Sequence, residues 1–126
     1  NVLYIVAGEV AAAVSARTWD EFVSSALFAP LGMSRSATSL AGVDPANSVA
    51  THVTPSDNTQ AAGRVVAMER PNDIANAAAA GAVWSTARDM ARWLDVHLRG
   101  GQIGSGPQRL FSAAQARELW TPQTLM

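Results

Sequence analysis

Apolar residues recur at helical spacing over the first part of the chain, from about Val2 to Ala16. They stand three or four positions apart at Leu3, Val6, Ala7, Val10 and Val14. The charged residues Glu9 and Arg17 lie beside this stripe. Asn1 occupies the N-cap position, where a side-chain oxygen accepts hydrogen bonds from the first unpaired amides. The pattern predicts a buried helix over residues 2–16.

A second helix is predicted directly afterwards. Thr18 and Glu21 have the spacing of a capping box, in which each side chain bonds the backbone amide of the other residue. The apolar face that follows consists of Phe22, Val23, Ala26 and Leu27. Pro30 and Gly32 are residues that end helices, so we expect this helix to end near Phe28.

Two more helices are predicted in the second half of the chain. Thr86 and Asp89 form a capping pair at the start of a helix predicted over about residues 87–99. Gly100-Gly101 is expected to end this helix, and the positive charge of Arg99 is favourable near the negative C-terminal end of its dipole. Its apolar face carries Met90, Trp93, Leu94, His97 and Leu98. Burial of Met90, Leu94 and Leu98 is expected to contribute about 1.5–3 kcal/mol each before entropy is counted.

The last helix begins at Ser112, with Gln115 three residues on as the second member of a capping box. It carries Ala116, Leu119 and Trp120 and is expected to end before Pro122.

Residues 33–74 are rich in Ser, Thr, Asn, Asp, Gly and Pro, which is typical of irregular structure. Two β-prone runs interrupt them, around residues 49–53 and 64–68, and predict a loose hairpin. An irregular stretch of this length often lines a site. In all, the chain is predicted to be a single, mainly α domain over residues 1–126, with about four helices and a small β-hairpin.

The amino-acid composition excludes some classes of function. The 48% hydrophobic and 15% charged content fits a globular chain, and the net charge of −1 does not favour nucleic acid or an acidic membrane surface. With no cysteine, disulfides, thiolate metal sites and cysteine nucleophiles are excluded. No apolar run reaches the roughly 18–20 residues of a membrane span. Because the 126 residues begin at Asn1 and stop at Met126, we expect a segment of a longer protein.

Two short serine motifs suggest catalysis but have simpler interpretations. Ser56-Asp57-Asn58 matches a motif of class A β-lactamases, yet Asp and Asn readily form turns in such a polar loop. Ser85-Thr86-Ala87-Arg88 has arginine where a Ser-x-x-Lys pair needs lysine. Arginine stays protonated and cannot accept the serine proton. We therefore interpret the second motif as a helix N-cap.

The two histidines give little support to catalysis or to metal binding. His97 lies on an apolar helix face, where packing is expected, and His52 lies in a predicted strand. No Gly-x-Ser-x-Gly or His-x-x-x-His spacing is present. The glycine-rich run at residues 101–106 is predicted to connect two helices. Core packing is expected for most of the tryptophans, Trp19, Trp84, Trp93 and Trp120.

Three stretches together resemble one family. They are Asn1–Glu9 followed by Trp19–Val23 and Phe28–Met33, then Ala80–Leu94, and finally Leu119–Thr124. The chain resembles the class C β-lactamase-like serine hydrolases, which include penicillin-binding proteins, D-amino-acid peptidases and esterases. The resemblance covers most of the chain and is weakest from Ser34 to Asn76.

The resemblance carries over one catalytic residue. Asn1 would be the asparagine of the family's Tyr-x-Asn motif, hydrogen-bonding the substrate and the catalytic lysine. The motif's tyrosine and the Ser-x-x-Lys pair would precede this chain, and the Lys/His-x-Gly motif would follow Met126. All nine basic residues here are arginines, so the Ser-x-x-Lys pair cannot lie within residues 1–126.

The resemblance implies acyl transfer through a serine acyl-enzyme, with no metal or organic cofactor. The chain would be the helical subdomain, one wall of a cleft shared with the α/β domain of the same protein, and inactive alone. Residues 48–73 would form the rim facing a small-molecule substrate, which would be a lactam, a peptide or an ester. An exported parent protein and self-association of the isolated segment are further expectations. The alternative is a non-catalytic relative that serves as a binding or interaction module.

Overall fold

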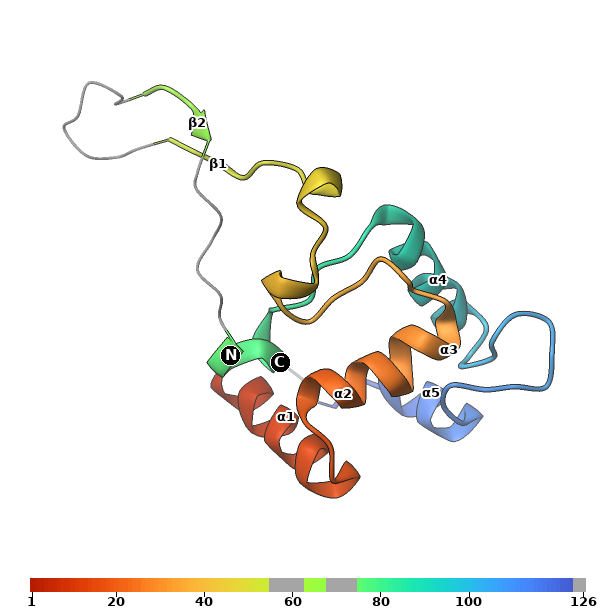
Figure 1. The fold of residues 1–126 in the computed structure, drawn as a ribbon. Helices are drawn as coiled ribbons and strands as arrows, with labels where there is room; N and C mark the ends of the chain where they lie inside the picture. The colour runs from red at the N-terminus through yellow and green to blue at the C-terminus, as the bar shows by residue number, and fades with distance from the viewer. Residues whose placement is uncertain (55–62, 68–74, 124–126) are drawn as a thin grey trace.

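The structure is a computed structural model that describes residues 1–54, 63–67 and 75–123 (Figure 1). It is mainly helical, as predicted. The α-helices are α1 (Val2–Ser15), α2 (Trp19–Val23), α3 (Ala29–Leu31), α4 (Ala87–Leu98) and α5 (Ala113–Trp120), and a π-helical segment, Ser24–Phe28, joins α2 to α3. Three 3₁₀ helices span Leu40–Gly42, Pro45–Asn47 and Ala75–Ala80, and two short strands are β1 (His52–Val53) and β2 (Val66–Ala67).

The second predicted helix begins as expected and ends later. The capping box is confirmed, since Thr18 Oγ1 accepts from the Glu21 amide at 3.2 Å and Glu21 Oε2 accepts from the Thr18 amide at 2.9 Å. The predicted end near Phe28 is wrong, because helical structure continues to Leu31. Pro30 lies in the first turn of α3, where a missing N–H is tolerated, and Gly32 ends the helix in the left-handed conformation with φ 65°.

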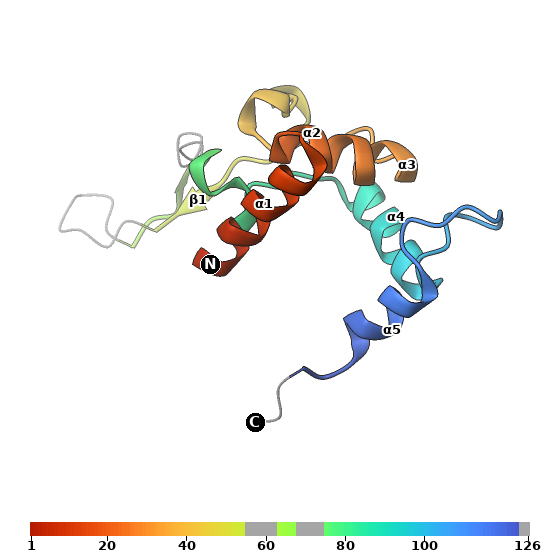
Figure 2. The same cartoon turned by 90° about the horizontal axis from the view of Figure 1, so that it is seen from below.

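The core lies between the α2–α3 segment and α4 (Figure 2). Its buried members are Val23, Phe28, Leu31, Met33 and Val96, and Trp19, Phe22, Leu27, Trp93, Ile103 and Leu110 pack against them. The predicted apolar face of the second helix is therefore confirmed. Trp19 and Trp93 pack as expected, whereas Trp120 is exposed.

The prediction that the first helix is buried is wrong for this chain. Leu3 and Val14 are 82% and 85% exposed, because no other described segment covers that side of α1. The opposite side lies against α2 and the 3₁₀ helix 75–80, where Gly8 is buried. A Cβ atom at Gly8 would lie 2.4 Å from the Cβ of Ala79, so the close approach depends on glycine. Asn1 is the N-cap residue, but its side chain makes no capping bond.

The helix predicted over residues 87–99 is observed, but its apolar face is largely uncovered. Met90 and Leu94 are exposed and Leu98 is 85% exposed, so the burial energy expected of them is not gained within this chain. The buried side of α4 carries Asp89 and Val96 instead. The helix ends at the predicted glycines.

The α5 helix and the hairpin are confirmed. Ser112 and Gln115 form the predicted capping box, with Ala116 buried. Strands β1 and β2 pair antiparallel, with His52 opposite Ala67, and the pair lies away from the helices (Figure 1). Within the described residues no single helix has the length and apolar composition to cross a bilayer. Only the bent pair Val2–Ser15 and Trp19–Leu31 passes that test, by length and composition alone.

Candidate functional site

Asn1, the catalytic residue implied by the family resemblance, lies exposed at the start of α1. Its backbone carbonyl accepts hydrogen bonds from the amides of Tyr4 (3.0 Å) and Ile5 (3.3 Å), which sets the first turn of the helix. The start of α1 lies beside the 3₁₀ helix 75–80 in Figure 1. The Asn1 side chain makes no capping bond within α1, and its amide group has two donors and one carbonyl acceptor.

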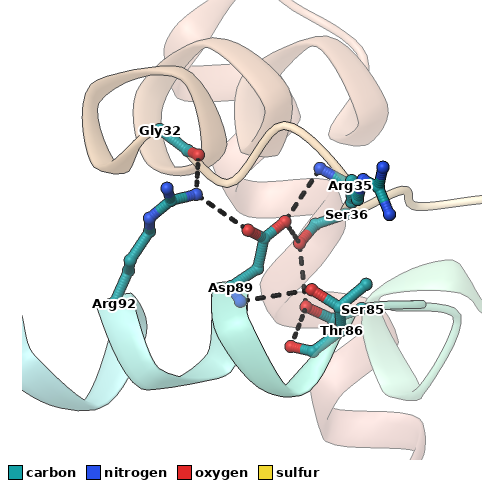
Figure 3. Close-up of polar contacts among 7 residues, drawn as sticks. All are labelled: Gly32, Arg35, Ser36, Ser85, Thr86, Asp89 and Arg92. Carbon is teal, nitrogen blue, oxygen red and sulfur yellow. Dashed lines mark hydrogen bonds and ion pairs between the residues drawn. The ribbon is translucent and has the colours of Figure 1, made fainter.

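The most extensive polar network in the described residues surrounds Asp89 (Figure 3). This side chain is 2% exposed, although it carries a carboxylate. Its Oδ2 accepts from the backbone amide of Arg35 at 2.8 Å and from Ser36 Oγ at 3.0 Å, and its Oδ1 accepts from the Arg92 guanidinium at 2.9 Å. Arg92 also donates to the carbonyl of Gly32. The network therefore satisfies a buried charge and holds the segment after α3 against α4.

Ser85 and Thr86 extend this network at the start of α4. Thr86 Oγ1 accepts from the Asp89 amide at 3.2 Å, which confirms the N-cap interpretation of residues 85–88. Ser85 Oγ lies 2.8 Å from Ser36 Oγ. A neighbouring hydroxyl is too weak a base to take the Ser85 proton, so this geometry does not activate a nucleophile. Ser56-Asp57-Asn58 lies outside the described residues, so its interpretation as a turn stays a prediction.

The histidines lie in different parts of the fold. The ring of His97 packs among Trp93, Phe111 and Trp120, with centroid distances of 4.4, 5.4 and 6.4 Å, as predicted for a packing residue. His52 lies in β1, as predicted.

The carboxyl group of Glu21, at the start of α2, has a displaced pKa. The pKa of Glu21 is lowered from its ordinary value of 4.5, because the carboxylate accepts hydrogen bonds from the Thr18 amide and then from the Thr18 hydroxyl, with a smaller contribution from the charge of Arg17. Because Glu21 caps α2, the lowered pKa reflects the capping hydrogen bonds that stabilise this helix, and it does not indicate a catalytic group.

Sequence reasoning missed the role of Asp89, because its spacing from Thr86 suggested only a capping pair. Thr86 does cap the Asp89 amide, but the carboxylate turns toward Arg35, Ser36 and Arg92. The sequence did contain one indication of this role, since Arg92 stands three residues after Asp89, at a spacing that allows an ion pair on a helix. Its partners in the segment after α3 stand more than fifty positions away in sequence, where no local pattern identifies them.

Comparison with known proteins identifies the family. The family model described as Beta-lactamase matches residues 1–126. No curated protein and no solved structure shows a significant match. Because the family match spans the whole chain, this protein belongs to the β-lactamase family, a family of serine hydrolases.

Proposed function

We propose that residues 1–126 form one wall of the active-site cleft of a serine hydrolase of the β-lactamase or penicillin-binding protein type. The enzyme would hydrolyse a lactam, peptide or ester through an acyl-enzyme. The observation that carries this proposal is the absence of lysine from a chain that matches the family over its whole length. The serine and lysine of the mechanism must then come from polypeptide outside these residues, and this chain alone is inactive.

In the proposed mechanism, a serine deprotonated by lysine and tyrosine attacks the substrate carbonyl. Backbone amides stabilise the oxyanion, the leaving group departs, and water releases the acyl group. Asn1 has two N–H donors and one carbonyl acceptor, so it can donate to the substrate and accept from the lysine ammonium at the same time. Its exposure at the start of α1 and its unused capping capacity support this role.

The uncovered apolar surfaces support a partner within the same protein. Leu3, Val10 and Val14 on α1, and Leu94 and Leu98 on α4, are exposed although they stand at the positions that a helix normally buries. We propose that the α/β domain of the parent protein covers them.

A labelling experiment tests the proposal. The full reading frame and residues 1–126 are each treated with a fluorescent penicillin and a fluorophosphonate, and the labelled serine is mapped by mass spectrometry. We expect one labelled serine outside residues 1–126 in the full protein and none in the segment. Labelling of a serine within the segment would refute the assignment of the nucleophile.

The role of Asn1 is tested in the same full protein. Asn1→Ala is expected to slow acylation by about 10- to 100-fold, as loss of a transition-state hydrogen bond does. Gln108→Ala, which removes an exposed amide from the loop between α4 and α5, serves as a matched control and should leave the rate unchanged. A full protein that no acylating probe labels would instead support the non-catalytic binding module.

A further inference from the structure

A cavity of about 470 Å³ lies between the segment after α3, the loop around residues 42–51 and the residues that precede α4. Its volume falls within the roughly 300–1,000 Å³ typical of ligand pockets. The residues that matter for its chemistry are Arg35, Asp44, Asn47, Thr51, Trp84 and Ser85. None of them takes part in the acyl-transfer steps proposed above, and only Thr51 belongs to residues 48–73, the stretch expected to face that substrate.

One wall of this cavity is held in place by hydrogen bonds that do not depend on a ligand. Ala37 and Trp84 exchange two backbone hydrogen bonds, of 2.9 and 2.8 Å. Ser36 Oγ lies 2.8 Å from Ser85 Oγ, and it donates a hydrogen bond of 3.0 Å to the buried Asp89 carboxylate (Figure 3). A wall that is already ordered binds a ligand with little further loss of entropy.

The facing wall is a short turn with its own polar support. Asp44 Oδ1 accepts from the Ala46 amide at 2.9 Å and so caps the 3₁₀ helix Pro45–Asn47. Asn47 and Thr51, which line the cavity from this side, are exposed. Their amide and hydroxyl groups are therefore presented to solvent and to any bound molecule.

The charges around the cavity favour a neutral ligand. Arg35 and Asp44 both line it, so the charges of its lining cancel and a ligand with a net charge of either sign gains no net attraction. What remains is a set of neutral donors and acceptors, from Asn47, Thr51 and Ser85, around the partly exposed Trp84. An indole presents a flat, electron-rich face. A pyranose ring has the complementary surface, with polarised C–H bonds on one face and hydroxyls along its edge.

We propose that this cavity binds a neutral saccharide, with one pyranose ring on Trp84 and its hydroxyls bonded to Asn47, Thr51 and Ser85. The described residues supply all the groups named for this site, and binding needs no nucleophile. Saccharide binding can therefore be tested separately from the proposed acyl transfer, and failure of one proposal does not refute the other.

The test uses ¹⁵N-labelled residues 1–126 in which Leu3 and Val14 are replaced by lysine to suppress association, titrated with maltose, cellobiose and di-N-acetylchitobiose. The four tryptophans give four indole N–H signals, which report separately on different parts of the fold. We expect the Trp84 signal to shift with at least one saccharide, with a Kd of about 1–10 mM, while the Trp120 signal stays in place. No shift of Trp84 by any of the three at about 50 mM would overturn the proposal.

Variants identify the surface that binds. Asn47→Ala combined with Thr51→Ala is expected to weaken binding about tenfold, and Trp84→Phe about threefold, with Trp120→Phe as the matched control that leaves the Kd unchanged. The dispersion of the remaining amide signals shows that each variant is folded. An unchanged Kd in the folded double variant, or a Trp84 signal that responds to sodium sulfate and to no saccharide, would contradict the neutral saccharide site.

Discussion

At the scale of single residues, the buried carboxylate of Asp89 is the feature with the largest expected energetic effect. Without it, the Arg35 amide, the Ser36 hydroxyl and the Arg92 guanidinium lose their acceptor. Groups left unpaired at such a site retain the cost of desolvation. The two ion pairs of α4 are therefore expected to differ in their contribution to stability. Asp89 is buried, whereas Asp95 and Arg99 are each about half exposed.

We predict that Asp89→Ala lowers the free energy of unfolding by about 2–4 kcal/mol, because it removes several buried hydrogen bonds together. The matched control is Asp95→Ala on the same helix, which should cost less than about 1 kcal/mol because its pair is exposed. Urea unfolding followed by circular dichroism measures both. Equal losses in the two variants would show that the Asp89 network contributes little.

The capping carboxylate of Glu21 predicts a pH dependence. Its pKa is lower in the folded chain than its ordinary value of 4.5, because it accepts hydrogen bonds from Thr18. The unfolded chain binds this proton first as pH falls, so the cap contributes its stability above pH 4.5, and that stability is lost as pH falls through the folded pKa. Carbon-detected NMR titration of the Glu21 carboxyl should give a midpoint below 4.5, and Thr18→Ala should raise it. A midpoint that Thr18→Ala leaves unchanged would mean that the capping bonds do not cause the shift.

At the scale of elements, the contact between α1 and the 3₁₀ helix 75–80 depends on the missing side chain of Gly8. We predict that Gly8→Ala destabilises the chain by about 1–2 kcal/mol, because overpacking at Ala79 outweighs the gain in helix propensity. The neighbouring substitution Glu9→Ala, on an exposed position of the same helix, should have little effect. Thermal unfolding by circular dichroism compares the two. A more stable Gly8→Ala variant would show that the two elements separate easily.

Element positions could be predicted from sequence wherever the determinant is local. The Thr18–Glu21 and Ser112–Gln115 boxes and the Thr86 cap fixed three helix starts, because each is a contact between residues three apart. The π-helical segment Ser24–Phe28 was not predicted, and it moved the end of the second helix past Pro30. Phe28 and Leu31, at and just after this segment, are both buried in the core, and 3.6-residue periodicity does not predict a π-helical turn.

The orientation of helix faces was harder to predict than their existence. An apolar stripe at Leu3 and Val14, or at Leu94 and Leu98, identifies the side that a helix tends to bury, but not the polypeptide that covers it. For the candidate site, the sequence supplied Asn1 and the Ser85–Thr86 cap. The contact between residues 34–36 and Asp89 could not be predicted, since it joins segments that only the tertiary fold brings together.

At the scale of the whole molecule, the exposed apolar helices predict association. We expect residues 1–126 to form concentration-dependent oligomers in sedimentation velocity, because large uncovered apolar patches are rare on monomers. Replacing Leu3 and Val14 with lysine should shift the chain toward monomer. Glu9→Lys changes the net charge by the same amount without removing apolar surface, and should leave the association intact. A wild-type chain that sediments as one monomeric species at every concentration would contradict this expectation.

The paired backbones of Ala37 and Trp84 have a consequence for how such a protein diversifies. Because the two residues lie side by side, the segment between them returns to the place where it leaves. Within that segment the strands β1 and β2 are paired in the same way, whereas residues 75–80 pack against α1. Doubling the length of a flexible excursion costs only about 0.6 kcal/mol of closure entropy. Insertions, deletions or segment exchange between Val53 and Val66 should therefore alter recognition while the helices and residues 75–80 keep their packing, which makes this part of the chain a suitable place to graft a new specificity.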